Sequence, residues 1–243
     1  MVNRIIAFTG KARSGKDTSC TLLQSELEHK GFKVKIFAFA DNLKRTAQSI
    51  FKLTEEDLYG KTKETPQKFC LNSKEYVYPI RDAMYEHCRV NIPFHICEFM
   101  ADALCEKLKQ VGKKSFWTML GFGETYWVSS RQIQQIWGSD VVRECLNDLF
   151  WIEDLDYRVE DFLSRDELSV ALVSDVRFDS EVEWLISKNA HLIEVKRSNA
   201  VEISSHKSEN GINSKYQRDI IENNGTLLEL KQRLLETVNF INY

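Results

Sequence analysis

GKARSGKDT, residues 10–18, decides the fold class because it lies between a short apolar run and a helical pattern. The run IIAF, residues 5–8, predicts a buried strand, and the residues after Lys16 predict a helix that ends near Gly31. The two glycines of the stretch allow the backbone to curl so that successive N–H groups point inward, at the positive end of the helix. This context predicts a phosphate-binding P-loop in which Lys16 reaches the outer phosphates of a nucleotide. An ordinary glycine turn before a helix is the alternative.

Asp17 stands where such loops normally have a serine or threonine whose hydroxyl contacts Mg²⁺. A carboxylate is a hard oxygen ligand that can bind Mg²⁺ directly or through water, and Thr18 keeps a hydroxyl near the phosphates. Asp17 could instead be a first-turn acid that stabilises the helix dipole. Because phosphates would repel an acid that has no cation beside it, we favour the metal-related role.

Apolar runs alternate with longer helical patterns, which predicts an α/β fold with a parallel sheet covered on both faces by helices. Further strands are expected at 34–39, 170–173, 192–195 and 220–221. Further helices are expected at about 41–51, 78–90, 95–111, 129–137, 140–150, 179–188 and 226–240. Residues 60–128 interrupt the alternation because they are helical, rich in aromatic residues and cysteine, and without an evident strand. They predict an insertion that forms a lid or a dimer surface.

VALVSDVRFDSE, residues 170–181, places an acid and an arginine directly after a buried strand. The carboxyl ends of parallel strands are where α/β sheets bind their ligands. Asp175 is therefore a candidate for holding Mg²⁺ through water, and Arg177 for binding an anionic substrate group. A salt bridge at the start of the next helix is the alternative. Glu181, four residues after Arg177, could aim that guanidinium or stay in solvent.

SSRQIQQIWGSDVVRECLNDLFWI, residues 129–152, supplies further candidates for substrate binding. The candidates are Arg131, Gln135, Gly138, Ser139 and Trp151. The first two share one helix face, the glycine and serine predict a tight turn before a helix N-terminus, and the indole could stack on a base. Each has a simpler alternative: a surface charge for the arginine, a helix cap for the turn, and a core position for the tryptophan.

The bulk composition limits the class of protein. With 243 residues, 43% of them apolar, the chain can bury a sizeable core in one ordinary domain. A net charge of −3 gives no overall field that would attract nucleic acid or an anionic membrane, so neither is expected as a direct partner. No apolar run approaches the roughly 20 residues that span a bilayer, and no leader pattern opens the chain. We therefore expect an intracellular, cytoplasmic protein.

Six cysteines are scattered without a CxxC pair, which is typical of free thiols in a reducing compartment. His87, Cys88, His95, Cys97 and Cys105 are close in sequence, so a zinc site is an alternative to packed helix residues. Their spacing matches no common zinc motif, which favours packing.

The chain resembles the phage-type deoxynucleoside monophosphate kinases, a branch of the P-loop nucleoside monophosphate kinases. The resemblance rests on blocks in one order: GKARSGKDT; FADNLKR with FKLTEEDLYGKTKETP (39–66); SRQIQQIWGSDVVR with FWI; SDVRFDSEVEWL; IEVKRS; and SHKSENG followed by ENNGTLLELKQRL. The blocks cover the chain from end to end apart from about 67–128. The aspartate at position 17 belongs to the family's own version of the loop.

The resemblance implies a single P-loop kinase domain over 1–243, with three layers, a parallel sheet and a mainly helical insertion at about 67–128. It implies transfer of the γ-phosphoryl group of ATP to a deoxynucleoside monophosphate with the help of Mg²⁺, for DNA precursor synthesis in a host cytoplasm, by a homodimer. The ATP-binding residues that it implies are Gly10, Lys11, Arg13, Ser14, Gly15, Lys16, Asp17 and Thr18. Around the monophosphate it implies Arg131, Gln135, Gly138, Ser139, Trp151, Asp175, Arg177 and Glu181. The expected catalytic residues are Lys16, Arg131, Asp175 and Arg177, and the expected Mg²⁺ ligands, directly or through water, are Asp17, Thr18 and Asp175.

Three positions depart from the family pattern: Ser198 where proline usually follows Arg197, Asn42 where proline often precedes Leu43, and Ser139 where threonine is usual. Two other functions are compatible with the same motifs. One is a kinase of another small phosphorylated metabolite, such as dephospho-coenzyme A. The other is a P-loop module that binds ATP without transferring phosphate.

Overall fold

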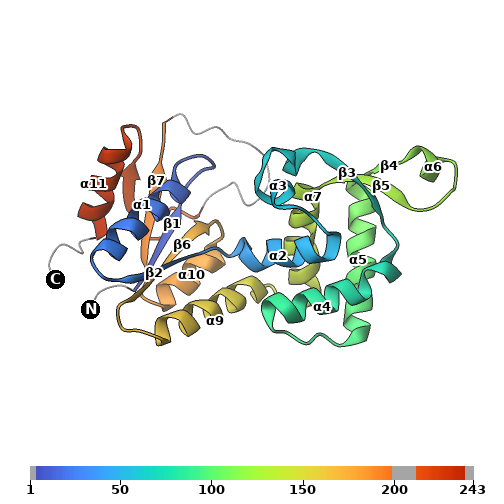
Figure 1. The fold of residues 1–243 in the computed structure, drawn as a ribbon, viewed down its shortest axis with the longest axis horizontal. Helices are drawn as coiled ribbons and strands as arrows, with labels where there is room; N and C mark the ends of the chain where they lie inside the picture. The colour runs from blue at the N-terminus through green and yellow to red at the C-terminus, as the bar shows by residue number, and fades with distance from the viewer. Residues whose placement is uncertain (1–3, 199–211, 239–243) are drawn as a thin grey trace. The chain divides into compact units, whose positions relative to one another are not determined.

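The computed structural model describes residues 4–198 and 212–238, and the chain divides into two compact units. The first unit comprises Met1–Phe39 and Leu155–Tyr243, and the second comprises Ala40–Asp154 (Figure 1). The block SHKSENG (205–211) and Phe240, at the end of the expected last helix, lie outside the described residues.

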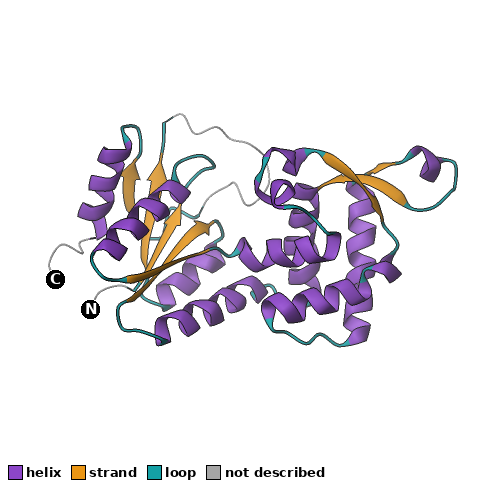
Figure 2. Ribbon diagram, in the orientation of Figure 1, coloured by secondary structure: helices purple, strands orange, loops and turns teal. Residues whose placement is uncertain are grey.

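The first unit is built on a five-stranded parallel sheet with the order β2-β6-β1-β7-β8 (Figure 2). Its strands are β1 (Ile5–Thr9), β2 (Lys33–Phe37), β6 (Ser169–Val176), β7 (His191–Lys196) and β8 (Asp219–Glu222). Every neighbouring pair in this sheet is parallel. The predicted strands and the predicted α/β class are confirmed, with strand ends that differ from the prediction by at most three residues.

Helices cover both faces of this sheet, as the alternation of side chains requires. The helices are α1 (Lys16–His29), α9 (Phe150–Ser164), α10 (Asp179–Ser187) and α11 (Leu227–Val238). Ile6 and Leu172 point toward α1 and α11 and pack with Leu23 and Leu230. On the other face, Phe37 makes an edge contact with Phe162 of α9, with ring centroids 5.7 Å apart. The unit therefore has three layers, as predicted.

The second unit combines helices with a three-stranded antiparallel sheet of order β3-β5-β4. Its elements are α2 (Ala40–Phe51), α3 (Glu55–Tyr59), β3 (Pro66–Cys70), α4 (Val77–Cys88), α5 (Phe94–Val111), β4 (Lys113–Lys114), α6 (Phe116–Met119), β5 (Thr125–Ser129), α7 (Ser130–Gln135) and α8 (Arg143–Cys145), with 3₁₀ turns at Lys61–Glu64 and Ser73–Glu75. The prediction that 60–128 has no strand is wrong. Buried Tyr126 and Val128 alternate with exposed Trp127, a period of two that is too short to stand out among helices.

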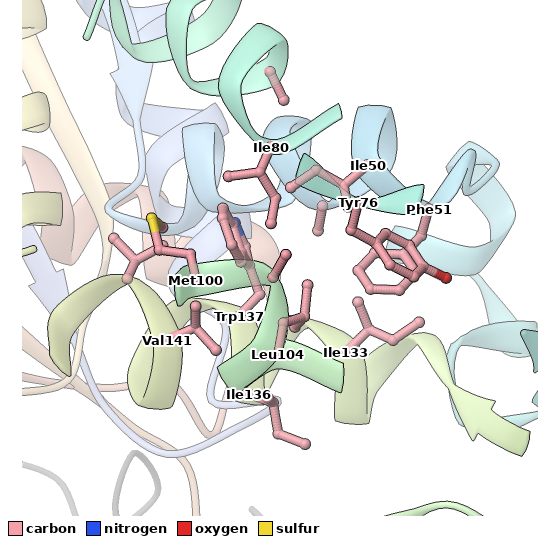
Figure 3. Packing of buried hydrophobic residues seen from close by; sticks show 14 of the residues in the cluster. Ile50, Phe51, Tyr76, Ile80, Met100, Leu104, Ile133, Ile136, Trp137 and Val141 are labelled. Carbon is pink, nitrogen blue, oxygen red and sulfur yellow. The ribbon is translucent and has the colours of Figure 1, made fainter. Parts of the chain in front are cut away.

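The core of the second unit is separate from that of the first and surrounds Trp137. Ile80, Met100 and Leu104 are buried in the same cluster (Figure 3). The indole N–H of Trp137 donates to Thr46 Oγ1 at 2.8 Å, so this large side chain is buried without an unpaired donor.

Asp57 holds the turn between α3 and β3 together. Its carboxylate accepts hydrogen bonds from the backbone N–H of Thr54 (2.9 Å), from the Thr54 hydroxyl (2.7 Å) and from the Thr62 hydroxyl (3.2 Å). A further bond comes from the Gln67 amide. The backbone bond from Thr54, followed by the side-chain bonds, lowers the pKa of Asp57 below its ordinary value, because each donor favours the ionised form.

Asp57→Asn is expected to lower the free energy of unfolding at neutral pH, because an amide cannot accept all of these bonds. A carboxylate with a lowered folded-state pKa stabilises the protein above its unfolded pKa of about 3.9, and the stabilisation is lost as pH falls through the folded value. The difference between variant and wild type should therefore shrink as the pH is lowered. Urea unfolding across this range measures it, with exposed Asp148→Asn as the control. A difference that stays constant or grows toward acid would contradict this role.

Candidate functional site

The loop between β1 and α1 has a backbone that only small residues tolerate at two positions. The φ angle is positive at Gly10 (139°), Arg13 (61°) and Gly15 (107°). A Cβ added at Gly10 would lie 2.3 Å from the carbonyl oxygen of Val195, and one at Gly15 would lie 2.2 Å from Nδ2 of Asn223. The two glycines are therefore required both by conformation and by the close approach of the ends of β7 and β8.

Asn223 anchors this loop to the sheet. Its Nδ2 donates to the carbonyl oxygen of Ser14 at 2.7 Å, while its backbone N–H donates to Lys196 O, also at 2.7 Å. The residue directly follows β8, the position where parallel sheets present polar groups. Sequence analysis did not single it out, because its partner lies about two hundred positions earlier in the chain. The available signals were the amide after the last strand and its place in the block ENNGTLLELKQRL of the family resemblance.

Two polar side chains of the loop have the properties of phosphate ligands. Lys16 Nζ donates to the carbonyl oxygens of Gly10 (2.7 Å) and Lys11 (2.9 Å), which holds the ammonium over the loop. The hydroxyl oxygen of Ser14 is buried and has no hydrogen-bond partner within the described part of the chain. An unpaired buried hydroxyl costs roughly 1–3 kcal/mol, and such groups are found where a ligand completes them. The residues present therefore fit a phosphate group.

The candidate metal ligands come from two elements of the first unit. Asp17 and Thr18 are exposed on the first turn of α1. Asp175 lies near the end of β6, where its Oδ1 accepts a hydrogen bond from the backbone N–H of Phe39 at 2.8 Å. The pKa of the buried Cys20 thiol is raised, first by burial and then by the charges of Asp17 and Asp175. The charges of both carboxylates thus act on one buried thiol of α1.

Arg177 emerges at the same edge of the sheet as the P-loop. β6 pairs with β1 in parallel, with Thr9 opposite Val176, and the Thr9 hydroxyl donates to Val176 O at 3.0 Å. Glu181 is 3% exposed, and its carboxylate accepts the backbone N–H groups of Arg177 (2.7 Å) and Phe178 (3.1 Å). Of the two alternatives for Glu181, the solvent position is wrong. The carboxylate instead fixes the backbone that carries the arginine.

The candidates at 129–152 belong mainly to one helical segment of the second unit. Arg131, on α7, forms an ion pair with Glu64 at 2.8 Å, and Gln135 ends the same helix. The predicted turn at Gly138 and Ser139 is wrong, because α7 continues through a π-helical stretch, Ile136–Val142, into α8. The predicted helix at 140–150 accordingly ends at Cys145, and α9 begins at Phe150. This continuity puts Gly138 inside a helix.

Gly138 and Trp151 have structural roles in this segment. A Cβ at Gly138 would lie 2.1 Å from Cδ1 of Leu43, so the glycine allows α2 to pack closely. Trp151 is 2% exposed, and its indole N–H donates to Gly138 O at 2.9 Å. A carbonyl oxygen of the π-helical stretch thus accepts a side-chain hydrogen bond. The structure confirms the alternative in which Trp151 is a core residue.

Two of the histidine and cysteine candidates have hydrogen-bond partners within the second unit. His87 Nε2 bonds to the Ser49 hydroxyl at 2.8 Å, and the Cys97 thiol lies 3.7 Å from Ile92 O. Burial raises the pKa of Cys105 to about 12, which keeps that thiol protonated. No set of three or more His, Cys, Asp or Glu side chains suited to a metal ion occurs in 4–198 and 212–238. Among the helices of these same residues, none has the length and apolar character to cross a membrane.

Comparison with known proteins finds similarity over nearly the whole chain. A family model described as "Deoxynucleotide monophosphate kinase" matches residues 4–234. A protein of Acanthamoeba polyphaga mimivirus, named "Putative deoxynucleotide monophosphate kinase", is 22% identical over 245 aligned positions. That alignment covers 97% of this chain and 96% of the viral protein.

Gly138→Ala is expected to lower the free energy of unfolding by about 1–3 kcal/mol, because the added methyl group overpacks the contact with Leu43. Combining it with Leu43→Ala should recover part of this loss relative to the sum of the single variants, since the clashing side chain is removed. Urea unfolding of both single variants and the double variant measures the coupling. An alanine variant of unchanged stability that binds its phosphate acceptor more weakly would show instead that Gly138 contacts substrate.

Proposed function

Because the chain belongs to the deoxynucleotide monophosphate kinase family, we propose that it transfers the γ-phosphoryl group of ATP to the 5′-phosphate of a deoxynucleoside monophosphate, giving ADP and the diphosphate. One observation supports this most strongly. The P-loop after β1 and the pair Asp175 and Arg177 at the end of β6 occupy the same edge of one parallel sheet. That edge therefore offers groups for two phosphates rather than one.

ATP would bind through the P-loop, with Gly10, Lys11, Arg13, Ser14 and Gly15 providing the loop backbone. The N–H groups at the start of α1 and the Ser14 hydroxyl would donate to phosphate oxygens. Lys16 would release the carbonyl oxygens of Gly10 and Lys11 and bind phosphate oxygens instead. Asp17, Thr18 and Asp175 would hold Mg²⁺, directly or through water. The ion supplies positive charge that screens the phosphates from one another.

The acceptor needs no general base in this reaction. The second pKa of a phosphate monoester is near 6, so the attacking oxygen is mostly ionised at neutral pH. What remains is to align two polyanions and to neutralise the charge that spreads over the transferred group. Lys16 and Arg177 would provide this, and Glu181 contributes by holding the backbone of Arg177 through two hydrogen bonds.

The substrate roles of Arg131, Gln135 and Ser139 remain predictions from the family resemblance. Arg131 would have to exchange its ion pair with Glu64 for an anionic group of the substrate. In this proposal Gly138 and Trp151 act through packing, because they shape the helix that bears these side chains.

Lys16→Ala is expected to reduce kcat/KM by about two to three orders of magnitude, which corresponds to roughly 3 kcal/mol of transition-state stabilisation. The reason is the loss of the mobile ammonium group that, in this proposal, the P-loop directs at the outer phosphates. The measurement is ADP release in a coupled assay with ATP and each of dTMP, dGMP, dCMP and dAMP. Lys30→Ala, an exposed lysine at the other end of α1, is the matched control and should retain wild-type turnover.

Two results of the same assay would contradict the proposal. Phosphorylation of dephospho-coenzyme A without phosphorylation of any deoxynucleoside monophosphate would indicate a different kinase. Turnover of ATP that no acceptor stimulates, with Lys16→Ala still active, would indicate that the loop does not serve phosphoryl transfer.

A further inference from the structure

Asn223 is fixed in the sheet through its backbone and in the P-loop through its side chain. It directly follows β8, and its backbone N–H donates to Lys196 O at 2.7 Å, next to the last register pair of β7 and β8. Its Nδ2 donates to the carbonyl oxygen of Ser14, also at 2.7 Å. The sheet therefore determines where this amide lies, and the amide determines the direction of one carbonyl group of the loop.

The hydrogen bond to Ser14 O also sets the direction of the next N–H group. The peptide bonds of the described residues are trans, and in a trans peptide the C=O and N–H bonds point in opposite directions. Because the Ser14 carbonyl points at Asn223, the N–H of Gly15 points away from Asn223. Positive φ angles such as those of Arg13 (61°) and Gly15 (107°) occur in turns whose N–H groups converge on an anion.

Two adjacent donors of the loop are available to a ligand. The Gly15 carbonyl accepts from the backbone N–H of Ser19 at 2.8 Å, whereas the Gly15 N–H donates no hydrogen bond to any described residue. The Ser14 hydroxyl is buried and lacks a partner in the same part of the chain. Such donors cost free energy unless a further group accepts from them. Because they belong to consecutive residues, one phosphate group can accept from both.

The Asn223 amide acts on this peptide at close range. A Cβ added at Gly15 would lie 2.2 Å from Nδ2 of Asn223, so the amide lies directly against the glycine. A hydrogen bond accepted by a peptide oxygen also polarises the peptide and makes its N–H a stronger donor. In the proposed reaction Lys16 leaves the carbonyl oxygens of Gly10 and Lys11 to bind phosphate. Asn223 instead keeps its bond to the loop while the nucleotide is bound.

We propose that Asn223 is a positioning residue of the phosphate site, which holds the Ser14–Gly15 peptide so that the Gly15 N–H donates to a phosphate of the bound nucleotide. The inference rests on the proposed function, because it takes the P-loop to be the site of ATP. Asn223 contacts no phosphate in this arrangement and acts only through the peptide. Its loss therefore weakens the binding of every polyphosphate by a similar factor, whatever base the ligand carries.

Binding of ADP with Mg²⁺ to the full chain, measured by isothermal titration calorimetry, tests this without turnover. Asn223→Ala should weaken ADP binding by about ten- to a hundredfold, because one charge-assisted hydrogen bond to phosphate is misdirected. Asn223→Leu, which keeps most of the side-chain volume but has no donor, should have the same effect. Gln24→Ala is the matched control, since it removes an amide of α1 that donates to Val34 O at 3.3 Å. It should bind ADP like the wild type.

Two further measurements separate positioning from a purely structural role and from direct contact with the nucleotide. The amide proton of Gly15, observed by NMR in protein labelled with ¹⁵N-glycine, should move downfield when ADP binds the wild type, because a hydrogen bond to phosphate deshields it. At saturating ADP this shift should be lost in Asn223→Ala. Inorganic tripolyphosphate with Mg²⁺ has neither base nor sugar, and the variant should lose affinity for it by the same factor as for ADP.

The outcomes distinguish this inference from the proposed function. All variants are compared at a temperature at which their unfolding curves show them folded, and Asn223→Leu serves if Asn223→Ala does not fold. A folded variant that binds ADP as tightly as the wild type would overturn the inference and leave the proposed function in place. So would a loss of affinity for ADP without one for tripolyphosphate, because it would indicate that Asn223 contacts the base or sugar. A wild-type chain that binds neither ligand would overturn both.

Discussion

The parallel pairing of β1 between β6 and β7 is the constraint on which the candidate site depends. In a parallel sheet all strands point the same way, so the residues that follow each strand gather at one edge. Thr9 lies opposite Val176 on one side and opposite Glu194 on the other. The P-loop, Arg177 and Asn223 therefore emerge at one edge although they are far apart in the chain. A strand order with β1 at the edge of the sheet would have left the loop without one of these neighbours.

The backbone conformation of the P-loop is energetically unfavourable, and neighbouring residues stabilise it. Arg13 has a positive φ, which is unfavourable for a residue with a side chain, and the Ser14 hydroxyl is buried without a partner in the described residues. The amide of Asn223 offsets part of this cost through its bond to Ser14 O, and Val195 O fits against Gly10 only because no Cβ intervenes. Local strain of this kind persists only where surrounding structure holds it. Here the ends of β7 and β8 hold the P-loop in its strained conformation.

Much of the first unit could be predicted from sequence because its signals are local. The continuous apolar runs of the strands, the glycines of the loop and the acid and arginine after β6 each follow from a few adjacent residues. The second unit was harder to predict from sequence. β3 and β5 have only five residues each, and β3 has no buried residue. Gly138 resembles a turn residue in the sequence, although it lies in a π-helical stretch and allows close packing with Leu43. Asn223 acts through a backbone partner far away in the chain, which no local pattern identifies.

The hairpin that joins β4 to β5 shows that the fold can determine which side chains are exposed as firmly as which are buried. The register of β5 places Tyr126 and Val128 in the core and Trp127 outside, and β3 and β4 pair with it in that register. Because side chains alternate, a slip of one residue would bury Trp127 and expose both core residues, so the core itself fixes which face is outward. The Thr118 bonds then fix the tip. The exposed apolar side chains of this hairpin are therefore a consequence of a well-determined fold.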